Sequence, residues 1–244
     1  REIYDRATNG YYDSHTLHYG LKPEQVVLTD EIIDRAVAAT LEEMFALGMF
    51  DDTYRDAKAA RDACATKADW DNAMAAHRKS VTLLKNDGTL PLKADKGLKV
   101  FAKAYDANTK IADMASDELK KLLGDVTLVD NPSDCDVAIF MVTPESGNYF
   151  SATKGFLELD ICENKTVCDV SETGIPLETT HQETTLTGLG EMTEAAKAVR
   201  AAGGKVIINV NITLPWMMGN VEPLADVLLV GYDTYQSATL DVIF

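Results

Sequence analysis

The sequence predicts an α/β fold, in which a mostly parallel sheet is sandwiched between helices. After residue 97, short apolar runs of strand length alternate with segments whose apolar residues recur at helical spacing. Residues 136–142 and 205–211 are almost wholly apolar, as in strands that are buried on both faces. The runs are separated by helices on short loops, and this order is typical of a parallel sheet that is covered on both sides.

The elements expected in this region follow that alternation along the chain. They are a strand Leu98–Ala104, a helix Lys110–Leu123, a strand Val126–Val129, a strand Asp136–Val142, a helix Glu191–Ala202, a strand Lys205–Asn211, a strand Asp226–Val230 and a helix from about Ser237.

Two more helices are expected before the sheet begins. The first starts at Thr29 or Asp30, either of which can cap it, and its apolar residues recur at helical spacing until Gly48 ends it. Residues 67–80 form the second helix, and residues 51–66 read as a linker between the two.

Residues 80–92 are expected to run from an extended segment through a tight turn into a second apolar run. Val81–Leu84 is the extended part, and the Asn-Asp-Gly sequence at 86–88 favours a turn because these residues tolerate turn geometry. Pro91 has no backbone N–H, so the run around it is an edge strand or a lead-in rather than a central strand.

The composition describes an ordinary globular chain with an acidic surface. Of its 244 residues 46% are hydrophobic and 25% charged, and the net charge is −16. Nucleic acids and anionic membranes bind basic patches, so neither is expected as a partner. No apolar run approaches the roughly 20 residues of a transmembrane helix. We expect a part of a longer protein, because the chain lacks an initial Met and a signal sequence.

The sequence offers weak candidates for metal or disulfide chemistry. Cys162 and Cys168 lie in a polar stretch and could pair, with free thiols as the alternative. A zinc site is not expected, because the sequence has no Cys-x-x-Cys motif and no nearby His pattern. His15 and His18 would share one face of a helix, but residues 1–28 are polar and weakly periodic, so a solvated loop is expected there.

Several common enzyme classes lack their motifs. No Gly-x-Gly-x-x-Gly follows a strand and no Walker loop is present, which disfavours Rossmann dehydrogenases and P-loop enzymes. A Gly-x-Ser-x-Gly nucleophile elbow is also absent.

Three phrases, in order, resemble glycoside hydrolase family 3. SVTLLKNDGTLPL at 80–92 is similar to the start of that family's second domain. LGMFDD at 47–52 is similar to the end of the last helix of its barrel domain, and residues 226–244 resemble its closing strand and helix. The resemblance covers about residues 29–244.

The resemblance implies a division of the chain into three parts. Residues 1–50 would be the C-terminal end of a (β/α)8-type barrel, residues 51–79 an interdomain linker and helix, and residues 80–244 an α/β sandwich domain that is truncated at its end. The implied partners are a carbohydrate substrate and the N-terminal barrel domain of the parent chain, and no metal or organic cofactor is implied.

A candidate catalytic group stands directly after the strand expected at 136–142. Ligands collect beyond the carboxyl ends of parallel strands, and Glu145 follows this strand in a loop that also holds Tyr149 and Phe150. A carboxyl near apolar rings has a raised pKa, as a general acid needs, and the two rings could stack on a sugar face. The alternative is that Glu145 is a solvated loop residue.

The resemblance implies that Glu145 is the catalytic acid/base, because many family members carry this residue in the corresponding loop with a Gly and an aromatic residue. The family phrase often continues with Asp-Arg, and no Arg follows here. The long stretch 151–185 holds other carboxylates, which are Glu158, Glu163, Glu172, Glu178 and Glu183. Some branches of the family take the acid/base from the barrel instead.

The second carboxylate of the reaction is not expected in this chain. Retaining glycosidases need a nucleophile as well as an acid/base, and in this family the nucleophile is an Asp on the barrel in a Ser/Thr-Asp-Trp phrase. Asp69 and Trp70 form an Asp-Trp pair, but Ala68 precedes it and it lies in the linker helix, so we interpret it as coincidence.

The function expected is therefore that of the C-terminal portion of a retaining β-glycosidase of β-glucosidase or β-xylosidase type, inactive by itself. The alternative is a non-catalytic carbohydrate-binding or barrel-stabilising module, which the missing Arg and the unusual 151–185 stretch favour. A third interpretation is an unrelated flavodoxin-like or receiver-like domain, and the order of the three phrases argues against it.

Overall fold

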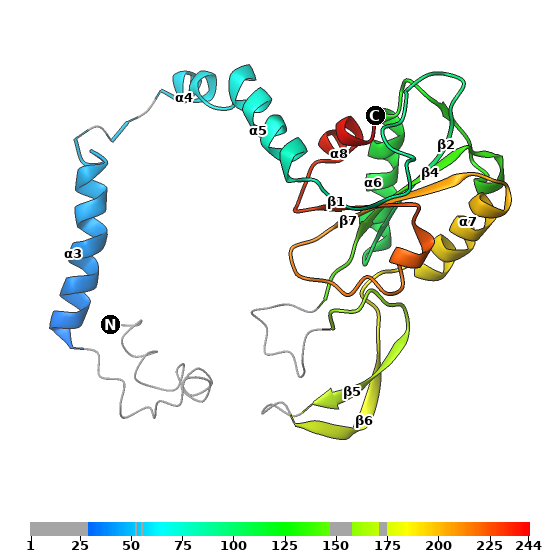
Figure 1. The fold of residues 1–244 in the computed structure, drawn as a ribbon. Helices are drawn as coiled ribbons and strands as arrows, with labels where there is room; N and C mark the ends of the chain where they lie inside the picture. The colour runs from blue at the N-terminus through cyan, green and yellow to red at the C-terminus, as the bar shows by residue number, and fades with distance from the viewer. Residues whose placement is uncertain (1–28, 52, 55, 147–157, 171–174) are drawn as a thin grey trace. The chain divides into compact units, whose positions relative to one another are not determined.

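The computed structural model of the chain (Figure 1) describes five stretches, which are residues 29–51, 53–54, 56–146, 158–170 and 175–244. The chain divides into two compact units, Arg1–Thr66 and Lys67–Phe244. Tyr149, Phe150, His15 and His18 lie outside the described residues.

The first unit contains the amphipathic helix that the sequence predicts. Helix α3 spans Asp30–Ala46, and the Thr29 side chain caps it by accepting a hydrogen bond from the N–H of Ile32. Within the described residues no side chain of α3 is buried. Its apolar face, which includes Val37 and Phe45, is exposed.

A short helix interrupts the segment expected to be a linker. Helix α4 spans Ala57–Ala63 and begins at Asp56, whose Oδ1 accepts a hydrogen bond of 2.7 Å from the N–H of Ala59. An Asp followed by an Ala-rich stretch is a start signal for a helix, so this element could have been predicted.

The second unit is built on a six-stranded sheet with the order β1-β8-β7-β4-β2-β3. Its strands are β1 (Thr82–Asn86), β2 (Lys99–Asp106), β3 (Thr127–Leu128), β4 (Val137–Thr143), β7 (Lys205–Asn211) and β8 (Val227–Gly231). All neighbouring pairs are parallel except β1 with β8, which is antiparallel. The predicted α/β class with a mostly parallel sheet is confirmed.

Helices cover the sheet on both faces (Figure 1). The helices of this unit are α5 (Lys67–Ser80), α6 (Thr109–Leu122), α7 (Leu189–Ala201) and α8 (Gln236–Ile243), with two single-turn 3-10 helices, η2 (Pro132–Asp134) and η3 (Glu222–Leu224). Side chains of α7 pack on one face, and side chains of α6 and α8 pack on the other. None of the helices in the described residues is long and apolar enough to span a membrane.

Strand β4 shows why the sheet is buried on both faces. Ala138, Phe140 and Val142 belong to the apolar cluster on the α7 side, and the alternate residues Val137, Ile139 and Met141 belong to the cluster on the α6 and α8 side. Successive side chains of a strand point to opposite faces, so a wholly apolar strand fits only between two covered faces.

The Asn-Asp-Gly turn predicted at 86–88 is confirmed. Oδ1 of Asn86 accepts hydrogen bonds of 3.1 Å from the N–H groups of Gly88 and Leu90, and Gly88 has a φ of +98°. Asp87 reaches Nζ of Lys205 at 2.5 Å, and this hydrogen bond, followed by those from Thr89, lowers the pKa of Asp87 to about 2. The apolar run around Pro91 is not a strand, in agreement with the lead-in that its missing N–H predicts.

The structure contains a hairpin that the sequence analysis missed. Strands β5 (Lys165–Val170) and β6 (Pro176–Glu183) pair antiparallel in a sheet of their own. The strands lie in the stretch 151–185, whose many polar residues leave no clear apolar alternation. The β-branched residues Thr166, Val167 and Thr180 favour strands and are the features of the sequence that could have indicated the hairpin.

The buried face of β4 gives a test of the packing. Phe140 is 0% exposed and contacts Tyr105 edge-on with ring centroids 5.7 Å apart. We expect Phe140→Ala to lower the free energy of unfolding in urea by about 3–5 kcal/mol, because it removes a fully buried ring and leaves a cavity. Met114→Ala, at a position 73% exposed, should change it by less than about 0.5 kcal/mol. Equal effects of the two substitutions would contradict the packing described.

Candidate active site

The carboxyl ends of the parallel strands form the edge of the sheet where a ligand would bind. Strands β2, β4, β7 and β8 end at Asp106, Thr143, Asn211 and Gly231. Because these strands are parallel, the loops that follow them leave the sheet at the same edge.

Glu145 lies at this edge, two residues beyond the end of β4. Its side chain is exposed, whereas Pro144 and Ser146 on either side of it are buried. The N–H of Glu145 donates a hydrogen bond of 2.9 Å to the carbonyl oxygen of Thr185. The loop is thus anchored through its backbone and its buried neighbours, and it presents one carboxylate to the outside.

Thr185 connects the Glu145 loop to the segment before the hairpin. It is 0% exposed, and its Oγ1 accepts a hydrogen bond of 2.9 Å from the N–H of Cys162 and donates one of 2.8 Å to the carbonyl of Asp160. Its own N–H donates to the carbonyl oxygen of Cys162 at 3.0 Å. Buried polar groups are costly without partners, and this network provides them.

Thr187, two residues after Thr185, binds the end of β2. The N–H of Thr187 donates to the carbonyl of Asp106 at 3.2 Å, and its Oγ1 donates to the carbonyl of Ala107 at 2.8 Å. Residues 185–187 therefore cross the carboxyl ends of both β4 and β2 before α7 begins.

Glu163 is used to cap α7. Its carboxylate accepts hydrogen bonds from the N–H groups of Gly188 at 2.8 Å and Gly190 at 3.0 Å, which are backbone donors at the start of that helix. Gly188 has a φ of +82°, and a Cβ there would lie 3.2 Å from the Tyr105 ring, so glycine suits this position. A carboxylate held by two backbone N–H groups is a structural cap.

Three other carboxylates of this stretch also have partners. Nζ of Lys165 lies 3.1 Å from Asp160 and 3.2 Å from Glu158, and these partners, Asp160 first, raise the pKa of Lys165. Glu183 contacts His181, as described below. Glu178 is exposed on β6, and Glu172 lies outside the described residues.

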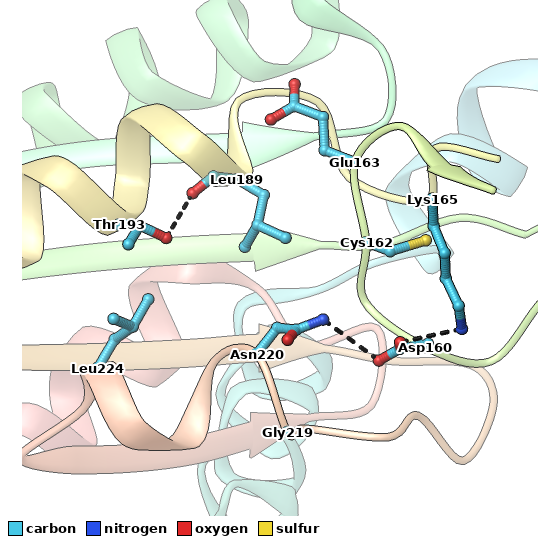
Figure 2. A pocket seen from close by; sticks show the side chains of 9 residues that line it. All are labelled: Asp160, Cys162, Glu163, Lys165, Leu189, Thr193, Gly219, Asn220 and Leu224. Carbon is cyan, nitrogen blue, oxygen red and sulfur yellow. Dashed lines mark hydrogen bonds and ion pairs between the residues drawn. The ribbon is translucent and has the colours of Figure 1, made fainter. Parts of the chain in front are cut away.

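An open cleft of about 570 Å³ lies beside these groups (Figure 2). Its lining comes from the segment before the hairpin, the start of α7 and the loop that leads to η3: Asp160, Cys162, Glu163, Lys165, Leu189, Thr193, Gly219, Asn220 and Leu224. Asp160, Lys165 and Asn220 form a polar end, and Leu189 and Leu224 form an apolar part. Glu145 does not line this cleft.

The hairpin carries a histidine between two carboxylates. Nδ1 of His181 lies 2.6 Å from Oδ1 of Asp169, and Nε2 lies 3.0 Å from Oε2 of Glu183. A neutral imidazole has a single N–H, so both contacts are hydrogen bonds only when the ring is protonated. Asp169, and Glu183 after it, raise the pKa of His181.

The raised pKa predicts how the hairpin responds to pH. The two contacts of protonated His181 with Asp169 and Glu183, called here the His181 clamp, stabilise the hairpin fully below the unfolded pKa of histidine, about 6.5. This contribution is lost as the pH rises through the higher folded pKa of His181. An NMR titration of the His181 ring should give a pKa above about 6.5. Asp169→Asn should lower that pKa more than Glu183→Gln does. A wild-type pKa at or below the unfolded value would show that the clamp does not form.

The described residues provide neither a metal site nor a disulfide. No group of three or more His, Cys, Asp or Glu side chains there could hold a metal ion. Cys162 is buried and Cys168 exposed, and both are free thiols, so the disulfide alternative is not realised. Trp70 lies in α5 with its ring centroid 6.1 Å from that of Tyr235, which fits a packing role for this tryptophan.

Comparison with solved structures identifies the fold. The chain is similar to the β-glucosidase from Listeria innocua in complex with isofagomine, with a TM-score of 0.54 and 19% identity over 88% of this chain and 31% of that one. It is also similar to the β-glucosidase EmGH1 from Erythrobacter marinus, with a TM-score of 0.53 and 15% identity over 96% and 35%. The fold is shared with β-glucosidases.

The similarity is one of structure, and it covers only a part of each matched enzyme. No family model matches the sequence, and no curated protein matches it. The β-glucosidase 3B from Thermotoga neapolitana gives a TM-score of 0.50 and 16% identity over 96% of this chain and 35% of that one. The chain thus spans about a third of the length of these enzymes. The fold that the family resemblance implied is confirmed.

Proposed function

We propose that the chain is the C-terminal portion of a family 3 retaining β-glycosidase, which hydrolyses O-glycosyl bonds in β-glucosides or β-xylosides. One observation carries the proposal. On a fold shared with β-glucosidases, Glu145 presents its exposed carboxylate from an anchored loop at the carboxyl end of β4. Structures of the Listeria enzyme hold glucose and laminaribiose, so carbohydrate is the substrate class that we assign here.

Glu145 would serve as acid and then as base. In the first step its protonated carboxyl donates a proton to the glycosidic oxygen while the nucleophile attacks the anomeric carbon. In the second step its carboxylate takes a proton from the water that releases the sugar. The loop continues to Tyr149 and Phe150, whose rings we propose as stacking surfaces for the sugar. No cofactor is needed for this chemistry.

Three other carboxylates, those of Glu158, Glu163 and Glu183, suit this role less well. Glu163 is held by two N–H groups of α7, and Glu158 and Glu183 have cationic or imidazole partners. A general acid needs a carboxyl that is free to hold and release a proton at the substrate. Glu178 is exposed on β6 and offers a control position.

The nucleophile would come from the N-terminal barrel domain of the parent chain. We propose that residues 1–50 end that domain, that residues 51–79 form the linker and helix, and that residues 80–244 form the sandwich domain. The exposed apolar face of α3 supports this division, because such a face is normally buried against a partner. The 244-residue chain alone is then expected to leave glycosides intact.

The experiment compares Glu145→Ala with the wild type in the full-length protein, on an aryl β-glucoside and an aryl β-xyloside. We expect the variant to lose about 10²–10⁴-fold in turnover, because general acid–base catalysis is removed. Azide should partly restore turnover and yield a β-glycosyl azide, since azide attacks the glycosyl-enzyme without needing a general base.

Glu178→Ala is the matched control, because it removes a carboxylate of the same type from the exposed hairpin. It should keep near-wild-type turnover and form no glycosyl azide. Full turnover in Glu145→Ala would place the acid/base elsewhere and refute the assignment.

The alternative is a non-catalytic carbohydrate-binding or barrel-stabilising module. The cleft of about 570 Å³ favours it, since Asp160, Lys165 and Asn220 offer polar groups beside the apolar Leu189 and Leu224. Under this alternative the full-length protein binds a β-glucoside without hydrolysing it, and Glu145→Ala leaves the binding affinity unchanged.

A further inference from the structure

Three segments that are distant in the sequence meet at one buried threonine. The loop after β4 reaches it through the N–H of Glu145, and the segment before the hairpin reaches it through Asp160 and Cys162. Thr185 itself lies between β6 and α7. No side chain other than that of Thr185 forms a described hydrogen bond to the backbone of Cys162 or to the carbonyl of Asp160.

The hydroxyl of Thr185 fixes the direction of its backbone. Its oxygen accepts from the N–H of Cys162 at 2.9 Å while its proton goes to the carbonyl of Asp160 at 2.8 Å, and a contact of 3.4 Å to the carbonyl of Cys162 is longer. Together with the 3.0 Å bond from its own N–H to Cys162, these contacts hold the residue on both sides of its Cα.

The fixed backbone in turn places Glu145. The carbonyl of Thr185 accepts the N–H of Glu145 at 2.9 Å, which determines where the Cα of Glu145 lies beyond the end of β4. The side chain of Glu145 is exposed, so packing around it does not set its position. The position from which this side chain leaves the loop therefore depends on the backbone hydrogen bond together with the buried neighbours Pro144 and Ser146.

We propose that Thr185 is a positioning residue for the acid/base of the reaction, and that its hydroxyl holds the backbone carbonyl on which the Glu145 loop rests. The inference rests on the proposed role of Glu145. It predicts that the loss of one hydroxyl, which touches neither Glu145 nor the substrate, weakens proton donation specifically.

Thr185→Val is the direct test, because valine keeps the shape of threonine and removes the hydroxyl. In the full-length protein kcat/KM is measured on phenyl β-glucoside, whose leaving group needs a proton, and on 2,4-dinitrophenyl β-glucoside, whose leaving group does not. We expect a loss of about 10- to 100-fold on the phenyl glycoside, the size of effect that a displaced catalytic group produces. The loss on the dinitrophenyl glycoside should be less than threefold.

Three further variants complete the design. Thr185→Ser keeps the hydroxyl and should restore the phenyl glycoside rate to within about threefold of wild type. Thr127→Val removes the hydrogen bond from another threonine hydroxyl to a backbone carbonyl, that of Lys96, on the far edge strand β3, and should change neither rate. Glu145→Ala, measured in parallel, should show the same dependence on the leaving group as Thr185→Val, with a larger loss.

The outcomes separate the inference from the proposed function. Equal losses of Thr185→Val on both glycosides, with a lowered melting temperature, would reduce Thr185 to a structural residue and overturn the inference while Glu145→Ala still shows the leaving-group effect. If Glu145→Ala shows no such effect, the proposed function fails, and the inference fails with it.

A measurement on the wild-type full-length protein covers the case in which Thr185→Val does not fold. Amide hydrogen exchange should show the N–H of Glu145 strongly protected and the Thr185→Ser chain equally protected. A Glu145 amide that exchanges at the unprotected rate in the wild type would overturn the inference, because the bond on which it depends would be absent.

Discussion

Burial of the parallel strands on both faces is the constraint on which the rest of the structure depends. Side chains of β4 alternate between two apolar clusters, and β7 contributes apolar side chains to both, so neither face of the central sheet has room for a ligand. Polar groups that act on a ligand can gather only where the strands end, and in a parallel sheet these ends share one edge. The position of Glu145 just beyond β4 follows from this constraint.

The described residues between β4 and α7 extend this edge through hydrogen bonds in addition to the apolar packing of Ile161 and Leu186. Thr185 binds the backbones of Glu145, Asp160 and Cys162, and Thr187 binds the end of β2. Glu163 closes the arrangement by capping α7. Two carboxylates of this segment therefore differ in their surroundings. Glu163 is hydrogen-bonded to the backbone of α7, whereas Glu145 is exposed at the edge of the sheet.

The sequence predicts those parts of the fold that apolar periodicity determines. The expected strands at 136–142 and 205–211 lie within one residue of β4 and β7, because burial on both faces demands an unbroken apolar run. The hairpin of β5 and β6 was missed, since both strands are rich in polar residues and β6 is exposed along almost its whole length, so no apolar alternation marks it.

The candidate site could be predicted only in part from the sequence. Glu145 stands next to a strong strand signal, so its place at the sheet edge could be deduced. The role of Thr185 could not, because its partners Cys162 and Asp160 lie 23 and 25 residues away and depend on tertiary structure.

The most direct test of the account is a crystal structure of the full-length protein with a glycoside analogue bound. The account predicts that the Glu145 carboxyl lies about 5–5.5 Å from the nucleophilic carboxylate of the barrel domain, as in retaining glycosidases. It also predicts a hydrogen bond from that carboxyl to the glycosidic oxygen. A Glu145 carboxyl farther than about 9.5 Å from the nucleophile, beyond the range of paired glycosidase carboxyls, would contradict the account.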